Sequence, residues 1–395
     1  MSGLHDPERL ARVALGRLGE PGDPRLAALV VDLGAARVAE HLRSEQDVTG
    51  LATDVAARLR GLDPAGDLER AAREGIRFVC PGDEEWPPRL ADLDHAAQLN
   101  GRGGAPLGLW VRGAGRLDAL VDRAVSVVGS RSATTYGAGV AGEIAAELTT
   151  AGVTVVSGAA YGIDQAAHRG ALAARGPTVA VLACGVDRAY PAAHRDLLRY
   201  VADTGLVVSE LPPGSAPTKL RFLARNRIIA GISLGTVVVE AAVRSGALNT
   251  ANWASLVNRP VMGVPGPVTS APSEGVHELI RTRDASLVTR AADVLELVSP
   301  AGSHTSAPRR APEHPRDRLS ETERQVLDGV PVATGAESAS IARTAGLSAR
   351  RTAEALVRLR AAGFVESSAT GWRLVAEGDT AAAGPRIPGQ TRPRP

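Results

Sequence analysis

A nine-residue segment carries the densest group of binding chemistry in this chain. From Lys219 to Arg227 it holds four cations, one amide and one aromatic ring, and no acidic residue. Guanidinium and ammonium groups bind phosphate oxygens, and an aromatic face stacks on a nucleobase. Because the 395-residue chain has a net charge of only +2, such a segment is a local feature of the molecule. The segment favours a polyanion-binding surface, and a solvated helix start is the alternative.

Short turns that combine glycine with serine or threonine occur on both sides of that segment. Gly129-Ser130-Arg131, Ser157-Gly158 and Ser245-Gly246 each lie between a β-branched run and a helical pattern, and Thr250 follows the last of them. Glycine allows close approach of the backbone, and amides at a helix N-terminus attract anions. The first turn lacks the G-x-G-x-x-G spacing, and the next strand ends in Ser157-Gly158 without a ribose-binding acid. A dinucleotide is therefore disfavoured, and we expect no cofactor.

Three side chains near these turns have a catalytic or metal-binding interpretation. Asp164 and His168 are four residues apart on one predicted helix, but no third metal ligand accompanies them. We therefore favour Asp164 as a helix N-cap or local hydrogen-bonding group. Ser157 has no base placed near it by the sequence. We expect neither a metal site nor a catalytic residue here.

A repeating pattern of strands and helices must position these turns. Six β-branched runs predict strands at Val125–Val128, Val153–Val156, Thr178–Leu182, Leu206–Val208, Thr236–Val239 and Val261–Val264. Helical stretches lie between many of them, at Gly139–Ala151, Asp164–Arg175 and His194–Thr204. Apolar strands separated by helices predict a mainly parallel, doubly wound, Rossmann-like α/β sheet. In such a sheet, ligands bind at the carboxyl ends of the strands, where the turns lie.

Smaller units flank this α/β core, which we assign to residues 76–298. Residues 1–75 predict short helices, and their stretch around Gly34 loosely resembles a helix-hairpin-helix, with a plain helical packing module as the favoured alternative. Residues 299–317 are rich in Pro, Ser and Ala and predict a flexible linker. Residues 318–376 predict a winged helix that opens with a capping box at Ser320 and Glu323. Residues 377–395 lack the apolar content to fold.

Composition narrows the class of protein. Cys80 and Cys184 are isolated from each other and form no zinc-type spacing, so we expect reduced thiols in a cytoplasmic protein. The first residues include acids and lack an apolar stretch, so no signal peptide is expected. The longest apolar runs are of strand length and cannot span a bilayer, so we expect no membrane contact.

The motifs together resemble the DprA/Smf family over about Phe78 to Val298. The matching strings are Gly129-Ser130-Arg131, Ser157-Gly158-x-Ala160-x-Gly162-Ile163-Asp164-x-x-Ala167-His168, Tyr190-Pro191, Ser209-Glu210, Arg225-Asn226-Arg227-Ile228-Ile229-Ala230-Gly231 and Val264-Pro265-Gly266. The resemblance implies a non-enzymatic protein that binds and protects single-stranded DNA, dimerises and loads RecA during natural transformation. It also implies that Arg131 and Lys219 hold phosphates and that an aromatic residue near Phe222 contacts a base.

These considerations give one set of candidate DNA-binding residues. The set is Gly129, Ser130, Arg131, Ser157, Gly158, Lys219, Phe222, Arg225, Asn226, Arg227, Ser245, Gly246 and Thr250. Lys219 is the only lysine of the chain and falls within this set.

Two other functions compete with this hypothesis. The Gly235-Thr236-x-x-x-Glu240 string partly resembles a motif of lysine-decarboxylase-like nucleotide hydrolases, in which Glu240 would be catalytic. We favour instead an ion pair of Glu240 with Arg225 or Arg227. The winged helix carries Arg350, Arg351, Arg358 and Arg360 on or near its recognition helix, and these could contact duplex DNA, dock a protein or simply be solvated. A transcription regulator is the third hypothesis, disfavoured because the basic segment lies in the core.

Overall fold

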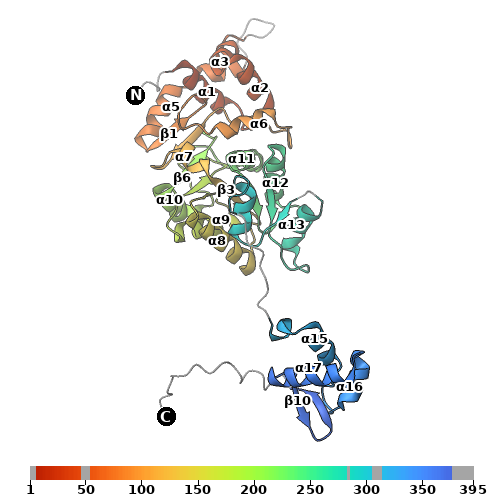
Figure 1. Ribbon diagram of the computed structural model, residues 1–395. Coiled ribbons are helices and arrows are strands. Elements are labelled where there is room, and N and C mark those ends of the chain that lie inside the picture. The colour runs from red at the N-terminus through yellow and green to blue at the C-terminus, as the bar shows by residue number, and fades with distance from the viewer. Residues whose placement is uncertain (1–5, 46–53, 283–284, 305–313, 376–395) are drawn as a thin grey trace, which may run out of the picture. The chain divides into compact units, whose positions relative to one another are not determined.

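The computed structural model describes residues 6–45, 54–282, 285–304 and 314–375. The chain divides into two compact units, Met1–Ser306 and Ala307–Pro395. The first unit contains both the N-terminal helices and the α/β core (Figure 1). The predicted boundary at residue 75 coincides with the passage from helix to strand, while the chain around it packs as one body.

A nine-stranded sheet forms the centre of the first unit. Its strands are β1 (Ile76–Val79), β2 (Leu109–Arg112), β3 (Ala124–Val128), β4 (Thr154–Ser157), β5 (Thr178–Val181), β6 (Leu206–Ser209), β7 (Thr236–Val238), β8 (Val261–Gly263) and β9 (Ser286–Leu287). The strand order is β1-β2-β6-β5-β4-β3-β7-β8-β9, in which β1, β2 and β6 pair antiparallel and the rest pair parallel. The predicted doubly wound, mainly parallel sheet is confirmed. Its strand order reverses between β3 and β7, which is where such sheets bind ligands.

Helices cover both faces of this sheet. They are α7 (Leu117–Asp122), α8 (Thr135–Thr150), α9 (Ile163–Ala173), α10 (Arg195–Thr204), α11 (Lys219–Gly231), α12 (Gly246–Leu256), α13 (Ala271–Thr282) and α14 (Ala291–Val298). Successive strand residues enter different cores: Val155 packs with α8 and α9, whereas Val156 packs with α11 and α12. Burial on both faces explains why the strand sequences are continuous apolar runs without alternation.

The N-terminal helices pack onto the edge of the sheet that carries β1 (Figure 1). They are α1 (Pro7–Leu18), α2 (Pro24–Leu33), α3 (Ala35–Ser44), α4 (Asp54–Arg60) and α5 (Pro64–Arg73), and η1 (Pro88–Ala91) and α6 (Asp92–His95) follow β1. In the turn at Gly34, the carboxylate of Glu8 accepts hydrogen bonds from the amides of Ala35 (3.0 Å) and Ala36 (2.9 Å). Those are the amides that a helix-hairpin-helix would offer to phosphate. The geometry therefore favours the packing-module interpretation.

The second unit is a small helical body with a hairpin. It contains η3 (Pro315–Arg318), α15 (Glu321–Asp328), α16 (Ser338–Ala345), α17 (Ala349–Ala361), β10 (Val365–Ser368) and β11 (Gly371–Leu374). The predicted capping box is present, since Ser320 and Glu323 each bond the other's backbone amide. These are the elements that the winged-helix prediction requires, and the assignment to that fold stays a prediction. The predicted tail 377–395 lies outside the described residues, as does part of the predicted linker.

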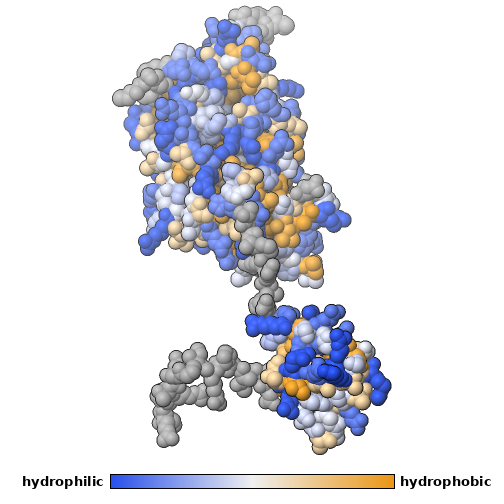
Figure 2. Space-filling model, in the orientation of Figure 1, coloured by the Kyte–Doolittle hydropathy of each residue, from blue (hydrophilic) through white to orange (hydrophobic). Residues whose placement is uncertain are grey.

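Two further observations concern extended segments and membranes. Strand β1 ends at Val79, because the carboxylate of Asp83 accepts a hydrogen bond from the amide of Cys80 and the chain turns there. Among the described residues, no helix has the length and apolar character needed to cross a membrane. The visible face of the molecule is largely hydrophilic, with apolar residues in small groups (Figure 2).

Candidate nucleic-acid interface

An open groove of about 780 Å³ lies at the carboxyl ends of β3 and β7, where the strand order reverses. Four cationic side chains line it, Arg131, Lys219, Arg225 and Arg244, against one carboxylate, Asp164. Asp164 and Arg225 are each only 6% exposed, so these two opposite charges lie below the groove surface and leave the exposed Arg131, Lys219 and Arg244 facing solvent. The groove therefore presents a strongly positive wall to any ligand.

Helix α11 forms one wall and divides its cations between two sides. Lys219, Phe222, Arg225, Asn226 and Ile229 line the groove, at spacings that place them on one helical face. Lys219 is exposed at the first turn, where Thr218 caps the helix by accepting from the amide of Arg221. The helix therefore presents its lysine and its aromatic ring along the same wall.

The remaining cations of α11 face other protein groups. Arg227 is fully buried and donates to both carboxylate oxygens of Glu210, at 2.8 and 2.6 Å. Arg221 donates to both carboxylate oxygens of Glu20, at 2.9 and 2.7 Å. The structure therefore places Arg227 outside the groove, in contrast to the sequence-based set.

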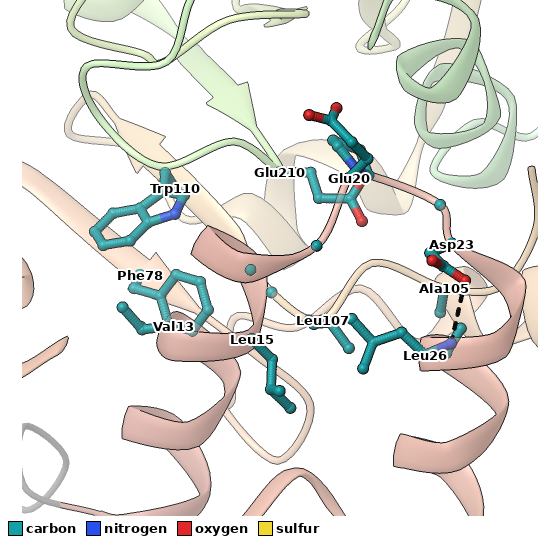
Figure 3. A pocket seen from close by; sticks show the side chains of 16 residues that line it. Val13, Leu15, Glu20, Asp23, Leu26, Phe78, Ala105, Leu107, Trp110 and Glu210 are labelled. Carbon is teal, nitrogen blue, oxygen red and sulfur yellow. Dashed lines mark hydrogen bonds between the residues drawn. The ribbon is translucent and has the colours of Figure 1, made fainter. Parts of the chain in front are cut away.

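A small cavity of about 30 Å³ lies beside this second face of α11 and is shown in Figure 3. Phe78 and Trp110 of the sheet form one part of its wall, with Val13 and Leu15 of α1. Glu20 and Glu210 lie close together at its edge in the figure. The carboxylates that neutralise Arg221 and Arg227 thus lie where the N-terminal helices contact the core.

Arg225 is held in place from below. Its side chain is 6% exposed and Nη1 donates to the carbonyl of Val181 at 3.0 Å. Burial lowers the pKa of Arg225 to about 10, and Asp164 opposes that shift, so the group stays protonated at neutral pH. A Cβ atom added at Gly158 would lie 1.4 Å from Nη1 of Arg225, so this glycine is required for the arginine to lie on the backbone. Gly158 supports the groove from beneath and does not line it.

Two aromatic rings meet at the groove. Arg131 lies over the Phe222 ring, 4.7 Å from its centroid, and the rings of Tyr190 and Phe222 are 5.6 Å apart. Tyr190 is 42% exposed, whereas Phe222 is only partly exposed. Tyr190 is therefore the more accessible stacking surface, although it is absent from the sequence-based set. The sequence feature that could have identified Tyr190 as a site residue is its position after the glycine turn that follows β5.

The turn after β3 offers fewer free amides than expected. The amide of Ser130 donates to the carbonyl of Glu240 at 2.6 Å. The carboxylate of Glu240 accepts from the amide (2.9 Å) and the hydroxyl (2.5 Å) of Thr134, the N-cap of α8. The expected ion pair of Glu240 with Arg225 or Arg227 is wrong, because this buried carboxylate neutralises the N-terminus of α8 instead.

The opposite rim is the start of α12. Ser245 caps this helix by accepting from the amide of Ala247, and Gly246 is exposed beside it. The amide group of Asn226 donates to the carbonyl of Gly246 (3.3 Å) and to Asn249 (3.1 Å). Asn226 thereby joins the two helical walls. The exposed Arg244 precedes the cap, and it is a cation that sequence analysis left out of the site.

Most of the sequence-based set comes together in this groove. The residues that line it are Gly129, Ser130, Arg131, Lys219, Phe222, Arg225, Asn226, Ser245, Gly246 and Thr250. Ser157, Gly158 and Arg227 do not line it. Ser157 is fully buried and donates its hydroxyl to the carbonyl of Val127 at 2.7 Å. Lining residues absent from the set include Tyr190 and Arg244.

The polar residues behind the groove serve the fold. Asp164 accepts from the amides of Gly158 (3.1 Å) and Ala160 (3.3 Å), which agrees with its interpretation as a local hydrogen-bonding group. Burial raises the pKa of Asp164, against the opposing charge of Arg225. His168 instead bonds the hydroxyl of Thr178 through Nδ1 at 2.8 Å. Among the described residues, no cluster of three or more His, Cys, Asp or Glu side chains could hold a metal ion.

Comparisons with known proteins bear on this groove. The family model described as DNA recombination-mediator protein A matches residues 77–299. A Mycobacterium tuberculosis protein named after DNA processing protein DprA is 44% identical over 380 residues, which cover 96% of this chain and 97% of that protein. DNA processing protein DprA of Streptococcus pneumoniae is 43% identical over 191 residues, covering 48% of this chain and 66% of that protein. The X-ray structure of Streptococcus pneumoniae DprA aligns with a TM-score of 0.56 at 32% identity and covers 74% of this chain and 98% of that chain.

Proposed function

This chain belongs to the DNA recombination-mediator protein A family, and we propose that it binds single-stranded DNA in the groove between α11 and α12. The observation that carries the proposal is the lining of the groove: three exposed cations, one buried arginine beside one buried carboxylate, and an exposed aromatic ring. Cations that follow a backbone, combined with rings on which bases stack, are the features of single-strand binding sites.

The shape of the groove favours a strand over a single nucleotide. It is open, and its cations come from three separate segments: the turn after β3, helix α11 and the loop before α12. A mononucleotide site would need several free backbone amides around a single phosphate. The amide of Ser130 and the N-cap of α8 already bond Glu240. Separate cations suit successive phosphates of one strand.

We further propose that the protein acts as a non-enzymatic mediator that protects the strand and delivers it to RecA as a homodimer. What supports this part is family membership, and the two catalytic candidates weighed from the sequence are both engaged in other bonds. Ser157 is buried against a carbonyl, and both oxygens of Glu240 bond Thr134. Glu240 is thus placed poorly for the hydrolase alternative, which no feature of the groove favours.

Fluorescence anisotropy with labelled oligo-dT tests the binding proposal. Arg131→Ala and Lys219→Ala should each weaken binding by roughly 1–3 kcal/mol, the range expected for a lost charged hydrogen bond. Binding should also weaken steeply with added salt, because the strand releases counterions. Arg25→Ala, an exposed arginine of α2, is the matched control. A folded wild-type protein that ignores oligo-dT at low ionic strength would refute the proposal.

A further inference from the structure

A second cationic pocket lies next to the groove, and we infer that it binds a further segment of the same single strand. This inference rests on the function proposed above. The pocket has a volume of about 590 Å³ and is lined by Arg112, Arg188, Arg195 and Arg199. They come from the end of β2, the loop after β5 and helix α10. Four guanidinium groups from three segments therefore converge on one hollow of the surface.

Most arginines of this pocket have no hydrogen-bond or ion-pair partner among the described residues. Within the described part of the chain, the guanidinium groups of Arg112, Arg188 and Arg195 form no hydrogen bond or ion pair. Among the residues that the structure describes, Arg199 pairs with Asp196 alone, at 3.2 Å, and both side chains of that pair are more than half exposed. Such exposed pairs exchange readily for a phosphate partner, since they contribute little stability.

The one carboxylate of the pocket is already engaged. Asp187 lines it, and both of its oxygens accept from the amide of Gly214 at 3.0 Å. This bond fixes the loop after β5 and leaves the arginines as the dominant charge. The pocket therefore attracts an anion that carries several separate negative groups.

An exposed aromatic ring adjoins the pocket, as in the groove. Tyr200 follows Arg199 on α10 and is 56% exposed, and the Arg199 guanidinium lies 5.4 Å from its ring centroid. Cations beside an accessible ring suit a strand whose bases are free to stack. An inorganic anion has no base that could stack on the ring.

The pocket and the groove are neighbours along one loop. Tyr190 lines the groove, while Arg188 and Ala189 line the second pocket. Only Ala189 lies between Arg188 and Tyr190 in the chain, so their Cα atoms are at most about 7 Å apart. A strand that leaves the groove over Tyr190 therefore meets Arg188 next. This continuity favours nucleic acid over an acidic peptide, because a strand bound in the groove would extend into the pocket, whereas the binding of a peptide does not require that the pocket adjoin the groove.

The test compares short and long oligonucleotides. The variant Arg195→Gln/Arg199→Gln removes two exposed charges from α10, and Arg25→Gln/Arg37→Gln removes two exposed charges from α2 and α3 as its control. Figure 1 shows α2 and α3 well apart from α10. Anisotropy would be measured on the full chain with labelled dT6 and dT25 over a salt series.

We expect the α10 variant to bind dT25 about tenfold more weakly than the control and to bind dT6 within about twofold of it. Its salt slope for dT25 should fall by about 1.4, at about 0.7 per lost phosphate contact. Equal binding of dT25 by both variants would overturn the inference while leaving the groove proposal intact. Loss of poly-glutamate binding with dT25 binding unchanged would overturn it in favour of an acidic peptide. If wild type bound neither oligonucleotide, the proposed function itself would have failed.

Discussion

Two glycines near the groove make room for charged side chains. Gly158 has no side chain, and the guanidinium of Arg225 occupies the space that a Cβ atom would fill. Gly137 allows the carboxylate of Glu240 to approach α8 in the same manner, since an added Cβ would lie 2.2 Å from Cδ of Glu240. Each of these glycines positions a charged neighbour, and in the proposed DNA site Gly158 would act through Arg225 without touching the strand itself.

We expect Gly158→Ala to destabilise the protein and to weaken oligo-dT binding together. The methyl group would displace Arg225 from the carbonyl of Val181 and leave buried polar groups unpaired, at a cost of about 1–3 kcal/mol in unfolding free energy. Urea unfolding and anisotropy would measure the two effects.

Gly246→Ala is the matched control for the effect of this substitution on stability. A Cβ atom at Gly246 has no neighbour within 4 Å, and the residue starts α12. Its unfolding free energy should stay the same or rise slightly, because alanine favours helix over glycine. Equal stability of the two variants would contradict the role assigned to Gly158.

Helix α11 has one side that lines the groove and another side that forms ion pairs within the protein. Its groove side carries Lys219 and Arg225, while its other side is neutralised by Glu20 and Glu210. The hydrogen bond from Arg221 holds the pKa of Glu20 below its usual value. The N-terminal helices therefore withdraw one cation from the region where DNA is proposed to bind.

We expect Glu20→Gln to strengthen oligo-dT binding about two- to fivefold and to steepen its salt dependence. Arg221 precedes Phe222 in the first turns of α11, so a released guanidinium can reach a phosphate at the rim of the groove. Glu69→Gln, an exposed acid of α5, controls for the change in net charge. Anisotropy over a salt series measures both variants, and identical affinities would show that Arg221 stays away from the strand.

At the scale of the whole molecule, buried polar groups link stability to pH. His168 is fully buried between α9 and the sheet, and burial lowers its pKa from 6.5 to about 3. The unfolded chain therefore binds a proton at this histidine below about pH 6.5, while the folded chain does not. Its contribution to stability is complete above pH 6.5 and is lost as the pH falls toward 3.

The unfolding free energy should accordingly fall by up to about 1.4 kcal/mol per pH unit between pH 6 and 4 on account of His168. His168→Gln should reduce that slope by the same amount, as measured by urea unfolding across this range. His95→Gln removes an exposed imidazole and serves as the control. A slope unchanged by His168→Gln would show that other groups cause the acid sensitivity.

The amino-acid pattern alone was sufficient for the layered core, because continuous apolar strands separated by helices admit few arrangements other than a parallel sheet covered on both faces. It also located the groove, since turns after parallel strands must converge on one edge. It could not predict which cations of α11 line the groove. Arg227 and Arg225 are two residues apart on the same helix, and they differ only in the groups that pack against them in the folded protein. Folding brought Glu210 to one and the backbone of Gly158 to the other. Those partners are distant in sequence, and only three-dimensional packing determines which charges stay free for a ligand.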